Sequence, residues 1–191
     1  MAMSPELRDF CGNWRQKATD YGHDVRGAFD RFFTLYVVFN RLYAEATFRL
    51  ARKGQVKLQK RFPDSQASQE YVVQFVTARR LTDAWTGSPE VSTAIAEIAD
   101  HLRQHQFFLK MDLVTGEQRP NEDADLLVRL ESKGLNKRAQ AGLEVLYAIR
   151  CNMFHGHKGF RPVQLDLLRP ALVLLEATIE VLQHALEENG G

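Results

Sequence analysis

The sequence has few cysteines, no long apolar run and almost no net charge. Its 191 residues include only Cys11 and Cys151, too few for a disulfide framework, which favours a reducing cytoplasm. No apolar run approaches the roughly 20 residues that a membrane span requires, and the segment Met1 to Arg8 lacks the apolar region of a secretory signal. The 25 Lys and Arg nearly balance the 24 Asp and Glu, which argues against a broad cationic surface for duplex DNA. We therefore expect a cytoplasmic protein with no membrane partner.

The composition is otherwise that of an ordinary globular protein. Hydrophobic residues make up 45% of the chain and charged residues 26%, which excludes wholesale disorder. The chain is long enough to bury a core, and its sequence contains no internal repeat or low-complexity tract. We expect one helical domain over residues 1–191.

Apolar residues recur three and four positions apart along most of the chain, which is the spacing of one helical face. The longest stripe begins after Asp24, a suitable N-cap, and ends before Gly54; it contains Val25, Phe29, Phe32, Tyr36, Phe39, Tyr43, Ala46 and Leu50. Further helices are predicted over residues 65–85, 88–102, 122–131, 136–153 and 166–186. Ser88, Asn136 and Asp166 are the predicted N-caps of three of them, and Pro170 is expected in the first turn of the last.

The helical period is lost between residues 107 and 121. Gly116 and Pro120 favour an irregular excursion or a short hairpin there. Together the patterns predict an all-α, up-and-down bundle of about five to seven helices, in which the longest helices pack antiparallel.

One segment concentrates polar side chains at the end of an otherwise apolar helix, Ala148-Ile-Arg-Cys-Asn-Met-Phe-His-Gly-His-Lys158. The guanidinium of Arg150 can clamp a phosphate and the imidazole of His155 can transfer a proton near neutral pH. Cleavage of RNA through its own 2′-hydroxyl needs these two functions. Residues five apart on an ideal helix differ by about 140° and about 7.5 Å, so either the helix ends before His155 or two copies pool these side chains across a two-fold axis. The alternative is that both cations merely cap a helix C-terminus.

This segment resembles the signature of the HEPN superfamily, in which an arginine is followed after four to six residues by a histidine. His155 fits with four intervening residues and His157 with six. The segment Phe33-Thr-Leu-Tyr-Val-Val-Phe-Asn-Arg-Leu-Tyr43 also resembles the aromatic-rich helix that precedes the signature in many bacterial members. The resemblance implies a helical bundle, usually a homodimer with the two signatures facing each other. It also implies endoribonuclease activity that needs no metal or other cofactor, as is common in toxin–antitoxin and phage-defence systems.

The resemblance also implies roles for individual side chains of this chain. Arg150 would bind the scissile phosphate, His155 would transfer a proton, and Asn152 would orient the phosphate or the histidine. The side chains expected to bind the RNA backbone are His157, Lys158, Arg161 and Asn40. As a polar residue in an apolar stripe, Asn40 needs a hydrogen-bond partner, either at the same site or in a purely structural role.

One departure from the family pattern supports an alternative function. Many catalytic members place Asn, Asp or His directly after the arginine, where this chain has Cys151, and some relatives are inactive. The alternative is a non-catalytic module that binds a nucleotide or a partner such as a nucleotidyltransferase. An antitoxin is a further expected partner of an active enzyme.

Three other groups of residues carry weaker signals. Metal binding could involve Glu97, His101 and His105, which recur every four residues, or Cys151 with His155 and His157; a solvated face is the simpler interpretation, and we expect no metal. Nucleic acid could contact Arg79 and Arg80 near Tyr71 and Trp85 through charge and stacking, although a surface charge pair is again the simpler interpretation.

Overall fold

The computed structural model describes residues 3–58, 60–112, 114–154 and 160–188. These residues form α-helices, one π-helical segment and no β-strand, which confirms the all-α prediction. None of the helices in this part of the chain has an apolar stretch long enough to cross a bilayer.

The described residues contain more helices than the sequence predicts. In chain order they are α1 (Pro5–Ala18), α2 (Val25–Arg52), α3 (Asp64–Gln66), the π-helical segment η1 (Ala67–Tyr71), α4 (Val72–Val76), α5 (Ala78–Gly87), α6 (Pro89–Arg103), α7 (Pro120–Leu130), α8 (Leu135–Phe154) and α9 (Gln164–Glu188). Because α3, η1 and α4 are continuous, they count as one helix, and the described part of the chain has eight rather than five to seven. The sequence patterns do not predict α1, in which only Leu7, Cys11 and Ala18 are buried.

The second difference is a break within the helix predicted over residues 65–85. Thr77 separates α4 from α5 with φ 81° and ψ 141°, a backbone conformation that is costly for a β-branched residue. Its hydroxyl oxygen accepts a hydrogen bond from the Arg80 amide at 3.3 Å and so caps α5. Since neither glycine nor proline marks this position, the sequence pattern continues through it.

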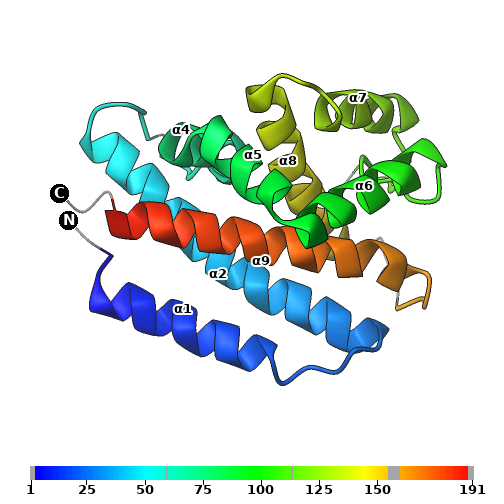
Figure 1. Cartoon of the computed structure of the whole chain (residues 1–191), viewed down its shortest axis with the longest axis horizontal. Coiled ribbons are helices and arrows are strands. Elements are labelled where there is room, and N and C mark those ends of the chain that lie inside the picture. The colour runs from blue at the N-terminus through cyan, green and yellow to red at the C-terminus, as the bar shows by residue number, and fades with distance from the viewer. Residues whose placement is uncertain (1–2, 59, 113, 155–159, 189–191) are drawn as a thin grey trace.

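The two longest helices, α2 and α9, pack side by side at the centre of the molecule. Arg49 near the end of α2 donates to the carbonyl of Leu186 near the end of α9 at 2.7 Å, and Figure 1 shows both helices running in the same direction. The prediction that the longest helices pack antiparallel is therefore wrong. Short loops make neighbouring helices antiparallel, as between α1 and α2, but α3 to α8 lie between α2 and α9 in the chain.

The helices α4 to α8 cover one side of this central pair (Figure 1). Trp85 of α5 is fully buried, and α8 lies so close to it that a Cβ atom at Gly142 would be 2.7 Å from the indole ring. Glycine at this position therefore sets the distance between α8 and α5. It also helps to place Arg150, two turns further along α8.

The helix starts agree with the sequence only in part. The Asp24 carboxylate accepts from the Gly27 amide at 2.7 Å, and the Ser88 hydroxyl accepts from the Val91 amide at 3.4 Å, so both predicted N-caps are confirmed. The N-caps predicted at Asn136 and Asp166 are wrong because α8 begins at Leu135 and α9 at Gln164. In both cases backbone carbonyls before the predicted cap already accept the first amides.

Pro170 lies inside α9 rather than in its first turn. Proline has no N–H, so the carbonyl of Asp166, four residues earlier, lacks its helical donor. The Nε2 atom of His101 on α6 lies 3.1 Å from this carbonyl oxygen. In the tautomer protonated at Nε2, His101 replaces the missing hydrogen bond and ties α6 to α9.

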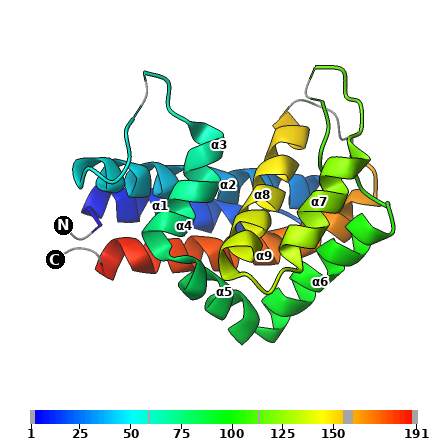
Figure 2. The ribbon, with the colours of Figure 1, turned by 90° about the horizontal axis from the view of Figure 1, so that it is seen from above.

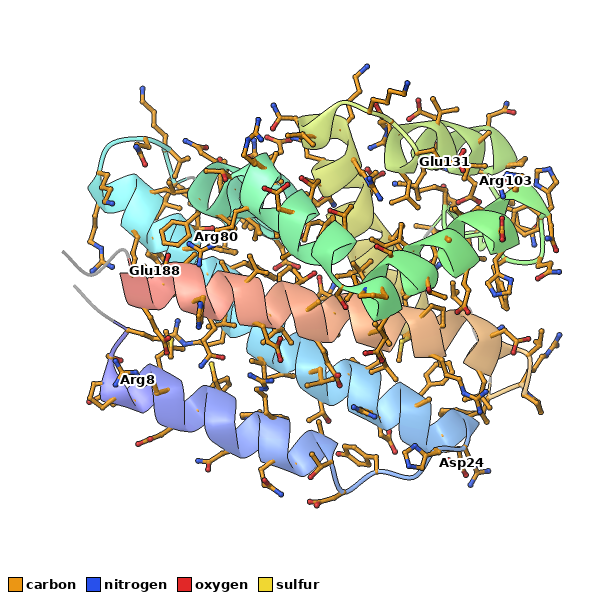
Figure 3. The ribbon with its side chains drawn as sticks, in the orientation of Figure 1. Arg8, Asp24, Arg80, Arg103, Glu131 and Glu188 are labelled. Atoms are coloured by element: carbon orange, nitrogen blue, oxygen red, sulfur yellow. The ribbon has the colours of Figure 1, made fainter. Side chains whose placement is uncertain are left out.

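Exposed ion pairs join several helices at the surface. Arg80 of α5 donates to Glu188 at the end of α9 at 3.0 Å, and Arg103 of α6 pairs with Glu131 beside α7 (Figure 3). Exposed pairs contribute at most about 1 kcal/mol each. Because Trp85 is buried and Arg80 pairs with Glu188, the structure favours a surface charge pair at Arg80 over stacking of nucleic acid on Trp85.

The irregular excursion predicted over residues 107–121 lies between α6 and α7. Met111 and Gln118 form a single antiparallel bridge, which gives the excursion the form of a short hairpin. Its base is fixed by Asp123 of α7, whose Oδ1 atom accepts from the amides of Leu109 and Lys110 at 3.1 and 3.0 Å.

Candidate functional site

Polar and aromatic side chains from three helices meet near the C-terminal end of α8. We call them the Arg150 cluster: Tyr36, Asn40 and Tyr43 of α2, Asp64 at the start of α3, and Tyr147, Arg150 and Cys151 of α8. Figure 2 shows the start of α3 and the end of α8 on the same side of the molecule. The π-helical segment η1, which follows α3, packs against both α2 and α8. Such widened turns are frequent at functional sites.

Asp64 connects the polar members of the cluster. Its Oδ2 atom lies 3.7 Å from Nη2 of Arg150, and its Oδ1 atom accepts a hydrogen bond from the Tyr43 hydroxyl. The side-chain amide of Asn40 donates to the Tyr43 hydroxyl and lies 3.4 Å from Asp64 Oδ1. The structure thus places Asn40 in the same cluster as Arg150, with Asp64 between them.

The guanidinium of Arg150 lies between aromatic rings. Its Cζ atom is 5.8 Å from the ring centroid of Tyr36 and 5.9 Å from that of Tyr147, within the range of cation–π attraction. Its Nη1 atom lies 3.8 Å from the Cys151 sulfur. One quarter of the Arg150 side chain remains exposed to solvent, so an anion in solution can reach it.

The cluster keeps its arginine charged and its tyrosines protonated. Burial acts against the charge of Arg150, but contacts with Cys151, Tyr36 and Asp64 outweigh it, and the guanidinium pKa is raised above its ordinary value. Burial raises the pKa of Tyr147 to about 12. It also raises the pKa values of Tyr36 and Tyr43 well above the ordinary value, and Arg150 offsets only part of this effect. At neutral pH the cluster therefore contains one cation beside neutral tyrosines, and the Asp64 carboxylate pairs with that cation and accepts from Tyr43. A guanidinium with hydroxyl groups beside it is a combination that suits a phosphate.

The Tyr36 hydroxyl is the one polar atom of the cluster that is buried and unsatisfied within the described part of the chain. The residue is only 4% exposed, and its ring contacts the Arg150 guanidinium. A buried hydroxyl without a partner costs about 1–3 kcal/mol. The Tyr36 ring thus belongs to the surroundings of Arg150, while its hydroxyl is shielded from solvent.

Asn152 lies apart from the Arg150 cluster in the described contacts. It is 2% exposed, and its side-chain amide donates to the carbonyl of Leu109 at 3.0 Å, which ties α8 to the excursion between α6 and α7. Residues two apart on a helix point about 200° apart, so Asn152 and Arg150 face nearly opposite sides of α8. This placement favours a structural role for Asn152 over the predicted role at the phosphate.

Several predicted site residues lie beyond what the structure describes. His155, His157 and Lys158 fall in residues 155–159, outside the described residues. Arg161 is exposed just before α9, and the described contacts do not join it to Arg150. Among the described residues, no group of three or more side chains is placed to bind a metal ion; His101 instead contacts Gln106 and the Asp166 carbonyl.

Sequence reasoning missed four members of the cluster. Tyr147 lies one helical turn before Arg150, so its i, i+3 spacing is a signal that points to contact. Tyr36 and Tyr43 are visible only as members of an apolar stripe, and the buried face does not reveal their hydroxyl groups. Asp64 follows Pro63 at a helix start, where an aspartate is common for local reasons, so no sequence signal connects it with Arg150.

No family model, curated protein or solved structure matches this chain.

Proposed function

We propose that this protein is an endoribonuclease that cleaves single-stranded RNA without a metal ion. The observation that carries the proposal is the Arg150 cluster, in which a charged and partly exposed guanidinium lies beside protonated tyrosines. In the sequence, Arg150 precedes His155 by five residues. In phosphate transfer by acid–base catalysis, an imidazole can move the proton and a guanidinium can stabilise the charge on the phosphate.

In the proposed reaction the 2′-oxygen of the RNA attacks the adjacent phosphorus and displaces the 5′-oxygen of the next nucleotide. The 2′-hydroxyl loses its proton to a base and the leaving oxygen gains one from an acid, and His155 serves in proton transfer. Arg150 stabilises the negative charge that develops on the phosphate. The products are a 2′,3′-cyclic phosphate and a 5′-hydroxyl.

The proposed active form is a homodimer with the site at the interface. Because His155 follows Arg150 by about 140° and about 7.5 Å on a continuing helix, a second copy can supply the missing side chain. Next to the cluster, α2 presents Phe33 with 43% of its surface exposed, and Val37, one turn further, is half-buried. An apolar surface next to the site is consistent with a covered interface. The proposal includes a toxin or phage-defence role in the cytoplasm, with an antitoxin as partner.

The test is cleavage of a labelled single-stranded RNA in the presence of EDTA. We expect wild-type protein to release cyclic-phosphate ends. His155→Ala should lose at least about 100-fold in rate, the usual contribution of a positioned acid or base, and Arg150→Ala a similar factor, the usual contribution of one group that stabilises charge in the transition state. His184→Ala is the matched control, because His184 is exposed on α9. Equal rates for His155→Ala and wild type would contradict the proposal, as would activity that EDTA abolishes.

The alternative is a non-catalytic module that binds a nucleotide or a protein partner such as a nucleotidyltransferase. The ion pair between Arg150 and Asp64 favours it, because a carboxylate already neutralises part of the guanidinium charge. Calorimetric titration with nucleotides separates the two functions. Binding that depends on Arg150 in a protein that never cleaves RNA would support the alternative.

A further inference from the structure

The connection between α2 and α3 carries a concentrated positive charge. Residues 53–63 include four cations, Lys53, Lys57, Lys60 and Arg61, and no aspartate or glutamate. All four are exposed. We call residues 53–63 the basic loop; Gln59 is its one residue outside the described part of the chain.

The charge of the basic loop is not neutralised by the described part of the protein. Many arginines elsewhere form ion pairs, among them Arg15 with Glu180 and Arg119 with Asp112. Even Arg52, directly before the loop, pairs with Glu45. None of the four cations of the loop has a carboxylate within ion-pair distance among the described residues. In a chain with a net charge of +1, this is a local positive field that attracts anions.

Aromatic rings lie at the base of the basic loop. Phe62 stacks on Tyr43, with ring centroids 6.4 Å apart and an interplanar angle of 16°, and lies 5.9 Å from the ring of Phe48. Phe48 is 43% exposed. The three rings form a row that runs from the buried Tyr43, a member of the Arg150 cluster, to the exposed Phe48. Exposed aromatic faces are the usual platforms for unpaired bases.

The loop also ends at the candidate site. Pro63 is followed by Asp64, whose carboxylate lies 3.7 Å from Arg150. In Figure 2 the loop projects beyond the helices on the same side as the end of α8. A strand with one phosphate at Arg150 can therefore continue across Phe62 and Phe48 to the lysines.

We infer that the basic loop, together with Phe48 and Phe62, binds the single-stranded RNA that flanks the scissile phosphate. The lysines and Arg61 contact backbone phosphates, and the two phenylalanines stack on bases without reading sequence. The inference depends on the proposed function for its choice of RNA. An anionic membrane is the less favoured ligand, because membrane-binding surfaces need a broad apolar face and Leu58 is the one large apolar side chain that the described part of the loop exposes.

The experiment measures binding of a fluorescent single-stranded 2′-O-methyl RNA, which has no free 2′-hydroxyl and cannot be cleaved by the proposed reaction. Affinity is determined by anisotropy over a range of salt concentrations. For single strands, log K falls by about 0.7 per phosphate contact for each tenfold rise in salt. The variant Lys57→Gln/Lys60→Gln is therefore expected to flatten the slope by about 1.4 and to weaken binding about 25-fold at 0.1 M salt.

Two further variants separate charge from stacking. Lys133→Gln/Lys137→Gln removes the same charge from exposed lysines at the other end of α8. These lysines are more than 10 residues and roughly 20 Å along the helix from Arg150, so this variant should leave the slope of log K against log salt unchanged. Phe48→Leu should weaken binding by about fivefold or more, because one stacked base contributes at least about 1 kcal/mol, while the slope stays that of wild type. Melting curves establish that each variant is folded.

Equal slopes for the two lysine pairs, or no binding of the oligonucleotide by the wild type, would overturn the inference. Binding to phosphatidylserine vesicles that depends on Lys57 and Lys60, without RNA binding, would assign the loop to a membrane instead. The cleavage assay is independent of this result. If the loop variants behave as expected but no RNA is cleaved, the nuclease proposal fails and RNA binding by the loop stands.

Discussion

Replacing Gly142 by alanine tests whether close packing of α8 on α5 holds the candidate site in place. An alanine Cβ would lie 2.7 and 2.8 Å from two atoms of the Trp85 ring. Carbon atoms in contact are normally about 3.5–4.0 Å apart. Trp85 is fully buried, so neither the ring nor α8 can move without disturbing other core contacts.

The size of the effect follows from two opposing contributions. Overpacking a tight core costs about 1–3 kcal/mol, whereas alanine in place of glycine inside a helix stabilises by roughly 0.5–1 kcal/mol. We expect Gly142→Ala to lower the free energy of unfolding by about 1–2 kcal/mol. For a chain of this length, that corresponds to a fall in Tm of about 2–8 °C.

The assay is thermal and urea unfolding followed by circular dichroism, with Gly12→Ala as the matched control. Gly12 lies inside α1 and has no atom within 4 Å of its added Cβ position, so this variant should be stabilised by about 0.5–1 kcal/mol. The same substitution should thus have opposite signs in the two helices. If Gly142→Ala melts at or above the wild-type temperature, the packing of α8 on Trp85 is not what places the helix.

Four other predictions follow from side chains around the site and the core. Burial acts to raise the pKa of Glu144, but hydrogen bonds from Arg129 and Lys110 lower it overall. The ionised Glu144 carboxylate therefore stabilises the fold above about pH 4.3, and this stabilisation is lost as pH falls through the folded-state pKa. Urea midpoints of wild type and Glu144→Gln should differ at pH 7 and converge near pH 3. Asn152→Ala leaves the Leu109 carbonyl without its donor and should cost about 1–3 kcal/mol in urea unfolding. Tyr36→Phe removes a buried, unsatisfied hydroxyl and should leave the stability within about 0.5 kcal/mol of wild type or raise it. Burial raises the pKa of Cys11 to about 11, so iodoacetamide at pH 8 should label it slowly until the protein is unfolded, as read by mass spectrometry.

Each of these predictions has an outcome that would contradict it. If the urea midpoints of Glu144→Gln and wild type differ by the same amount at pH 7 and pH 3, ionisation of Glu144 does not contribute to stability. An unchanged stability of Asn152→Ala would show that the contact with Leu109 is not formed. A loss above about 1 kcal/mol in Tyr36→Phe would reveal a partner for the hydroxyl, and rapid labelling of Cys11 in the native state would contradict its burial.

Local signals in the sequence predicted most of the helices, although they missed α1 and misplaced the starts of α8 and α9. The stripe from Val25 to Leu50 gives α2, and the caps at Asp24 and Ser88 form as expected. The break at Thr77 was invisible, because neither a glycine nor a proline marks the position of its positive φ. Pro170 could lie within α9 because His101, distant in sequence, contacts the carbonyl that the proline leaves unpaired.

The sequence by itself determined the helical class and most of the helix ranges, and it predicted Arg150 at the end of an apolar helix as a candidate site residue. These follow from periodicity and from residue chemistry, which act over a few positions along the chain. Only the tertiary structure decided that α2 and α9 run parallel, that Asn152 faces away from Arg150, and that Asp64 and Tyr36 surround the guanidinium. Such contacts depend on how helices far apart in the chain pack together, and no pattern within one helix encodes the side chain that its neighbour will bring to it.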